Sequence, residues 1–337
     1  MTMGYGYAVA RLRAMERRFL DPAVLQRLVD AEDYGQSLKI LAETHYGLLL
    51  SGGNSSASLE KTLEEELLSL FAEVDAFVPD RTVTALVRAP YDFHNVKTLI
   101  KSAMLVKQGG RKRWDLLTSL GSVAVDDLIS AIESEDYRLL PFGLHLAVQA
   151  ALSAFEQSHD LLEVERILDA ALFAALPDLA AKIKSPGITR YVRFRIDGEN
   201  LRSTMRLKRL GLEPARVAAF LHPGGAVATA LFSSLAGEPF DGWPRVLAFS
   251  DLAPVLAAFG EDRGIGELLA DVEQSLEEEG LRLLERDRTR LEAPENLLWH
   301  LLAKETEIRN LRVILVSKAN GTDKTTTRRL LRRGTPG

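Results

Sequence analysis

One pattern recurs three times along this chain and constrains its fold more than any other feature. The three copies align on Asn95, Asn200 and Asn310, which are 105 and 110 residues apart. An acid lies three positions before each asparagine: Asp92, Asp197 and Glu307. A base lies two positions after it: Lys97, Arg202 and Arg312. The same grouping at nearly even intervals indicates an internal triplication.

Each copy carries its apolar residues at helical spacing. Positions −2, +1 and +5 from the asparagine lie on one face of a helix, because steps of three and four residues return to the same side. They hold Phe93, Val96 and Ile100, then Gly198, Leu201 and Met205, then Ile308, Leu311 and Leu315. The glycine in the second copy permits close helix approach. The second and third helices should stop at a C′ glycine eleven residues past the asparagine, and the first about one turn later. These glycines are Gly211, Gly321 and Gly109.

Helical periodicity also dominates the rest of the chain. Leu59, Leu63, Leu67 and Phe71 follow one another at four-residue steps. The best strand candidate, "YVRFRI" at 191–196, leads straight into a helical pattern, and we interpret it as the first turns of that helix. We therefore predict a nearly all-α protein.

The period of the triplication is too long for a solenoid repeat, so each copy should be a small helical subdomain. Three matched subdomains suggest a pseudo-threefold body around one shared concave centre. The predicted domains are repeat 1 at 1–105, repeat 2 at 106–215, repeat 3 at 216–321 and a basic C-terminal tail at 322–337.

Composition excludes several classes of function. The 337 residues include no cysteine, which excludes disulfides, thiolate metal sites and a cysteine nucleophile. A net charge of −5 gives no whole-chain attraction to nucleic acid. We expect no secretory signal at the start and no run of about 20 apolar residues that would span a bilayer. The chain should be a soluble protein that can still sit on a membrane complex.

The repeated asparagine flanks a buried stripe, where an amide must find hydrogen-bond partners. We expect a structural role, in which the amide bonds a neighbouring helix and fixes the packing register. The alternative is that the three asparagines line a ligand site. Repetition favours architecture over catalysis.

Motifs typical of catalysis are incomplete. "NGTDKTTT" (320–327) lacks the first glycine of a P-loop, and "GYGYAV" (4–9) lacks the third glycine of a dinucleotide fingerprint. "DDLIS" (126–130) resembles the magnesium-binding start of all-α prenyl-transferring enzymes, but Asp126 and Asp127 are also typical helix N-terminal acids. The six histidines show no zinc-binding spacing. We expect no cofactor, no metal and no catalytic residue.

The end of the chain is basic. From Lys318 onward it carries six bases against one acid, Asp323. Such a tail could bind lipid headgroups or an acidic partner. The alternative is a solvated helix with a frayed end.

The third copy, "KETEIRNLRVILVSKANG" at 304–321, strongly resembles the last-repeat signature of the C subunit of the prokaryotic V/A-type ATPases, whose eukaryotic counterpart is the d subunit. "YDFHNVKTLIKS" (91–102) and "DGENLRSTMRLK" (197–208) resemble the first two repeats. "YAVARLRAMERRFL" (7–20) and "LAETHYG" (41–47) resemble the family's start. The resemblance covers about residues 5–321.

The resemblance implies a funnel-like, all-helical protein of three similar subdomains. It also implies a non-catalytic rotor adapter on the cytoplasmic face of the membrane. Such an adapter links the shaft subunits D and F to the proteolipid ring and transmits torque between ATP turnover and proton or sodium transport. Candidate shaft contacts are Arg202, Arg206, Lys208, Arg309 and Arg312. The alternatives are a helical scaffold in another assembly and an all-α magnesium-dependent enzyme of the prenyl class.

Overall fold

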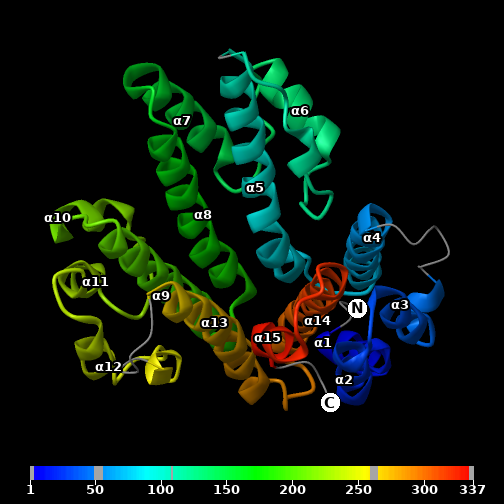
Figure 1. Ribbon diagram of the computed structural model, residues 1–337. Helices are drawn as coiled ribbons and strands as arrows, with labels where there is room; N and C mark the ends of the chain where they lie inside the picture. The colour runs from blue at the N-terminus through cyan, green and yellow to red at the C-terminus, as the bar shows by residue number, and fades with distance from the viewer. Residues whose placement is uncertain (1–3, 49–55, 108, 259–264, 334–337) are drawn as a thin grey trace. The chain divides into compact units, whose positions relative to one another are not determined.

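The computed structural model describes residues 4–48, 56–107, 109–258 and 265–333. Within these ranges every regular element is a helix, and no strand occurs (Figure 1). The predicted all-α class is confirmed. Two compact units are present, the first formed by Met1–Thr84 with Glu273–Gly337 and the second by Ala85–Val272. Their boundaries fall inside the predicted repeats.

The first unit is built around α14 (Glu295–Ala319), which is buried on nearly all sides. Helices α1, α2, α3, α4 and α15 pack against it or against one another. Its other elements are α1 (Tyr5–Met15), η1 (Glu16–Arg18), α2 (Pro22–Asp30), α3 (Tyr34–Ala42), η2 (His45–Leu48), α4 (Ser56–Asp75), most of α13 (Ile265–Asp287) and α15 (Lys324–Leu330).

The second unit contains α5 (Thr82–Lys107), apart from its first residues, and α9 (Pro186–Arg209). Helix α8 packs against both α7 and α9, and α10 and α11 also cover α9 (Figure 1). The remaining elements are η4 (Trp114–Leu116), α6 (Val125–Glu133), α7 (Leu144–Ser158), α8 (Leu161–Ile183), α10 (Pro214–Val217), η5 (Ala218–Phe220), α11 (Thr229–Leu235), η6 (Phe240–Gly242), α12 (Trp243–Val246) and η7 (Val255–Ala258).

Local sequence sets many of the helix starts. A side-chain oxygen caps a free backbone N–H in the first turn of five helices, which offsets the missing intrahelical acceptor. The caps are Asp21, Asp33, Asp160, Ser185 and Asp323. Asp126 and Asp127 lie in the first turn of α6, where their charge faces the positive end of the helix dipole.

The three repeated segments form the long helices α5, α9 and α14, which we call the signature helices. Each stops at a glycine with positive φ: Gly109, Gly211 and Gly321. The amide after each glycine donates to a carbonyl five residues back, and the glycine itself donates three residues back. This is the same Schellman end three times, as the glycine spacing predicted.

The predicted apolar stripes are confirmed. The residues at positions −2, +1 and +5 of all three signature helices are buried, Gly198 included. The stripe on α4 from Leu59 to Phe71 is buried as well. "YVRFRI" lies within α9 and is helical.

The basic segment after Gly321 contacts the N-terminal part of the chain. It forms α15, which packs against α2. Lys318 donates to the carbonyls of Val29 and Ala31 at 2.6 Å each, and Lys324 donates to that of Asp30 at 2.6 Å. These carbonyls end α2, where the helix dipole favours a cation. The sequence does not reveal that Lys318 and Lys324 cap another helix.

Candidate functional site: three clamps and a buried charge cluster

The three repeated asparagines make the same contact. Asn95 donates from Nδ2 to the carbonyl of Thr118 at 2.7 Å and accepts the Thr118 N–H at Oδ1 at 2.9 Å. Asn200 holds His222 in this way at 2.8 and 2.7 Å. Asn310 holds Arg332 at 2.9 and 2.9 Å. The partner lies 23, 22 and 22 residues further along the chain.

Each asparagine is buried and uses donor and acceptor together on one residue that lies outside any helix. We call this pair of hydrogen bonds the asparagine clamp. A clamped residue has both backbone groups satisfied without a strand or helix partner. The contacts therefore support the structural role expected for the asparagines. The prediction that each amide bonds a neighbouring helix was wrong. The partner is the backbone of a loop 22 or 23 residues further along the chain, and not a neighbouring helix.

The repeated acids of the first two copies bind backbone as well. Asp92 accepts the N–H groups of Ser122 and Val123 at 3.0 Å each, and the Ser122 hydroxyl at 2.6 Å. Asp197 accepts those of Ala226 and Val227 at 2.9 and 3.2 Å. A glycine precedes each bound pair because a Cβ at Gly121 or Gly225 would overlap the carboxylate.

Among the described residues neither of these two buried carboxylates forms an ion pair, although the charge of Arg88 acts on Asp92 and that of Arg193 on Asp197. Burial raises the pKa of Asp92, and it raises the pKa of Asp197 to about 6. The hydrogen bonds from backbone N–H groups oppose the shift, since they stabilise the charged form.

The third acid lies in different surroundings. Glu307 accepts the N–H of Leu20 at 2.5 Å, the hydroxyl of Tyr46 at 2.7 Å and the ammonium of Lys304 at 2.7 Å. Its side chain is fully buried, as is that of Lys304 apart from 3% of its surface. The partners of this acid thus come from the N-terminal helices and from its own helix.

The repeated bases contact acids on other helices in two copies out of three. Lys97 pairs with Asp169 on α8. Arg312 pairs with Glu60 on α4 at 2.8 Å. Arg202 instead pairs with Glu199 one turn earlier on α9, and its Nε is buried without a hydrogen-bond partner.

The remaining candidate shaft contacts have varied surroundings. Lys208 donates to the carbonyl of Ala236 at 2.7 Å and lies 5.6 Å from the centre of the Phe240 ring. Arg309 pairs with Glu277 on α13. Arg206 and Arg309 are exposed. Of the five candidates, Arg202, Arg206 and Lys208 belong to the second unit and Arg309 and Arg312 to the first.

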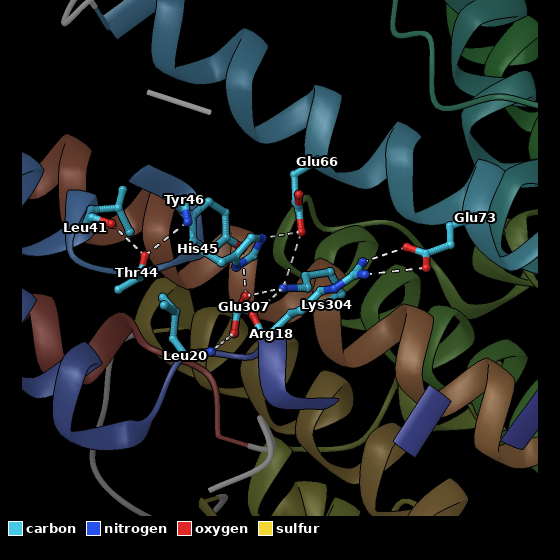
Figure 2. Close-up of polar contacts among 10 residues, drawn as sticks. All are labelled: Arg18, Leu20, Leu41, Thr44, His45, Tyr46, Glu66, Glu73, Lys304 and Glu307. Carbon is cyan, nitrogen blue, oxygen red and sulfur yellow. Dashed lines mark hydrogen bonds and ion pairs between the residues drawn. The ribbon is translucent and has the colours of Figure 1, made fainter. Parts of the chain in front are cut away.

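A charge cluster surrounds Glu307 inside the first unit (Figure 2). The ammonium of Lys304 also donates to the carbonyl of Arg18 at 3.1 Å and lies 3.6 Å from Glu66. His45 is hydrogen-bonded to the same Glu66 oxygen at 2.8 Å. The rings of Phe19 and Tyr46 lie 4.9 and 5.4 Å from the Lys304 nitrogen. Buried charges of this kind are stabilised only when paired and hydrogen-bonded.

The cluster shifts the ionisation of its neighbours. Burial, together with the charge of Glu307, raises the pKa of Tyr46 well above its usual value. Burial opposes ionisation of Glu66, but the hydrogen bond from His45 and the charge of Lys304 outweigh it and lower the pKa of Glu66. Burial and the charges of Lys304 and Arg288 lower the pKa of His300 to about 3. His300 is therefore neutral at pH 7.

Sequence reasoning missed the members of this cluster other than Glu307. Lys304 stands one turn before Glu307 in the quoted motif, and that spacing was the available signal. Arg18, Tyr46 and Glu66 are hundreds of residues from Glu307 in sequence, and no spacing could have joined them to it.

Two surveys of the described residues bear on what the molecule can do. Across 4–48, 56–107, 109–258 and 265–333, no three His, Asp or Glu side chains gather as a metal site. In the same ranges, no helix has the length and apolar character needed to cross a membrane. The contacts that the repeated residues make hold backbone segments and pair charges. They define an all-helical protein braced by buried polar contacts.

Comparison with family models matches residues 8–330 to the ATP synthase (C/AC39) subunit family, and the chain belongs to this family. The match includes α15, so it extends beyond the limit at Gly321 that the resemblance indicated. The signature helices and their clamps all lie within or next to the matched region.

Several characterised relatives cover most of the chain. The C subunit of the A-type ATP synthase of Methanocaldococcus jannaschii is 25% identical over 93% of this chain and 82% of its own length. The C subunit of the V-type ATP synthase of Thermus thermophilus is 25% identical over 85% of this chain and 94% of its own length. The C subunit of the V-type sodium ATPase of Enterococcus hirae is 23% identical over 92% of each.

Proposed function

We propose that this protein is the non-catalytic adapter in the central stalk of a V/A-type rotary ATPase. It binds the shaft subunits D and F on one side and the membrane proteolipid ring on the other. It transmits torque between ATP turnover and ion transport, and it sits at the cytoplasmic face of the membrane through the complex. The observation that carries the proposal is the family match over residues 8–330.

The repeated clamps suit a part that transmits torque. A rotor component must resist twisting, so its long helices need cross-links that do not slide. Each signature helix fixes a loop 22 or 23 residues away through two hydrogen bonds at one buried asparagine. Buried and fully satisfied polar contacts stiffen a fold, because any displacement leaves a polar group unpaired.

The charged ends of the helices offer polar contact points for a partner. Near its end, α9 carries Arg206, Lys208 and Arg209. Arg206 and Arg209 are exposed, whereas Lys208 is only partly exposed. We therefore rank Arg206 above Lys208 as a shaft contact.

A reconstitution experiment tests the proposal. The purified chain is mixed with the D–F shaft, and separately with proteolipid rings in gentle detergent, and binding is measured by pull-down. We expect the chain to retain both. A chain that retains neither would end the proposal.

A charge reversal sharpens the same experiment. Arg206→Glu should weaken shaft binding at least tenfold while ring binding stays unchanged, because a like charge replaces the attraction. Lys61→Glu reverses a charge that is 78% exposed on α4 and serves as the matched control. Equal loss in both variants would assign the effect to net charge and remove Arg206 from the contact.

A further inference from the structure

Three short helices begin with the same backbone. The residue before α2 is Asp21, with φ −60° and ψ 137°. Before α6, Ala124 has φ −61° and ψ 141°, and before α11, Ala228 has φ −63° and ψ 135°. The helices that follow have 9, 9 and 7 residues. Helices α6 and α11 each follow a signature helix in sequence, whereas α2 lies near the start of the chain.

The residue just before each of these positions donates its N–H to a repeated acid. Val123 donates to Asp92 at 3.0 Å, Val227 to Asp197 at 3.2 Å and Leu20 to Glu307 at 2.5 Å. In every case the donor stands two residues before the first residue of the short helix. The acid in every case stands three residues before a clamping asparagine.

In two of the copies, a base also binds a backbone carbonyl two residues before the N–H that binds the acid. Arg88, one turn before Asp92, donates to the carbonyl of Gly121. Lys304, one turn before Glu307, donates to the carbonyl of Arg18 at 3.1 Å. Gly121 and Arg18 each lie two residues before the N–H that binds the acid. A base and an acid on one helix thus hold the same three-residue segment from both sides.

From these correspondences we infer that residues 18–30 are the third copy of the element that follows a signature helix. Glu307 and Lys304 on α14 form its docking site. In the first two copies the element lies 29 to 31 residues after its acid, whereas Leu20 is separated from Glu307 by 287 residues. The N-terminal segment therefore completes the third repeat from the opposite end of the chain.

We call the contact between a repeated acid and the segment that it binds a joint. Because the third joint connects parts of the chain that are far apart in sequence, it can act as a latch, which means that it can open without unfolding the rest of the chain. When the Asp92 or Asp197 bonds break, the short connection to the signature helix keeps the released loop nearby. When the Glu307 bonds break, no short connection to α14 holds the N-terminal segment, and its remaining contacts with α14 and α15 are noncovalent and include packing and the hydrogen bonds from Lys318 and Lys324 to the end of α2. The N-terminal helices can therefore open as a unit while the rest of the chain stays folded.

Hydrogen exchange on the full-length protein tests the latch. Glu307→Gln weakens the docking site, and Asp92→Asn makes the same chemical change at a joint within the chain. In E307Q we expect amide exchange over residues 5–42 to rise about tenfold or more, because a hydrogen bond to a charged group is lost. In D92N, faster exchange should stay within residues 118–133.

Two results would overturn the inference. One is an E307Q protein whose α2 stays as protected as in the wild type. The other is an equal rise in exchange across α5, α8 and α9, which would indicate general destabilisation. If E307Q does not fold, Tyr46→Phe removes one donor to Glu307 and should give a smaller rise confined to the same N-terminal helices.

Discussion

All three repeated acids bind backbone N–H groups, but the surroundings of the third acid differ from those of the first two. Asp92 and Asp197 bind backbone N–H groups from a nearby loop, and neither carboxylate forms an ion pair among the described residues. Glu307 binds the backbone of a segment from the far end of the chain, and Lys304 and Tyr46 also bind it. A short loop is held by chain connectivity, so its joint needs little else. The third joint lacks that short chain connection, and the buried charge cluster around Glu307 holds the segment instead.

The largest effect should follow from removing the cation of that cluster. Lys304→Met leaves Glu307 and Glu66 without their buried partner, and breaking a buried ion pair from one side costs about 3–5 kcal/mol of unfolding free energy. Urea denaturation monitored by circular dichroism measures the loss. A loss below about 1 kcal/mol would show that the third joint does not depend on this charge.

Unlike the three acids, the three asparagine clamps should contribute equally to the unfolding free energy. Alanine at Asn95, Asn200 or Asn310 removes two hydrogen bonds and leaves an unpaired backbone N–H and carbonyl. We expect each substitution to lower the unfolding free energy by about 2–3 kcal/mol. If one of the three losses were negligible, that clamp would not contribute like the others.

The acid of the second copy should give the protein a pH dependence. Burial raises the pKa of Asp197 to about 6 in the folded state, above the ordinary value of 3.8. A raised pKa favours the folded state at low pH, and this contribution is lost as the pH rises from about 4 to about 6. It amounts to at most about 3 kcal/mol.

The matched variant for this test is Asp197→Asn, which cannot ionise. The difference in unfolding free energy between the wild type and D197N should fall across pH 4 to 6 and then level off. Urea denaturation at pH 4, 5, 6 and 7 measures it. A difference that stays constant over this range would remove Asp197 as the source.

The smallest effect should come from an exposed pair. Arg312→Ala breaks the ion pair with Glu60, whose two side chains are 44% and 45% exposed. Solvent screens such pairs, so we expect a loss of about 0.5 kcal/mol or less. A loss comparable to that of Lys304→Met would mean that exposure does not separate the two kinds of contact.

The sequence alone predicted much of this architecture. Helix spacing predicted the buried stripes of α5, α9 and α14, and glycine chemistry predicted their three ends. Repetition predicted a structural role for the asparagines, because a side chain that makes the same structural contact three times recurs at the same position of each repeated segment.

The partners of these side chains could not be predicted. Asn95 binds the backbone of Thr118, and any residue type carries the same N–H and carbonyl there. The correspondence of Leu20 with Val123 and Val227 likewise lies in backbone geometry. Lys318 and Lys324 could not be assigned to the end of α2 from the sequence. They bind backbone carbonyls there, and every residue type carries a backbone carbonyl.

A circular permutant tests the central claim most directly, namely that three copies of one element build the chain and that the N-terminus completes the third. A flexible linker joins residue 337 to residue 1, and new ends open at Gly52–Gly53. Residues 18–30 then follow α15 in sequence, as α6 follows α5. We predict a folded protein with the unfolding free energy of the wild type or higher. A permutant that does not fold, or that folds with residues 18–30 unprotected from exchange, would contradict the account.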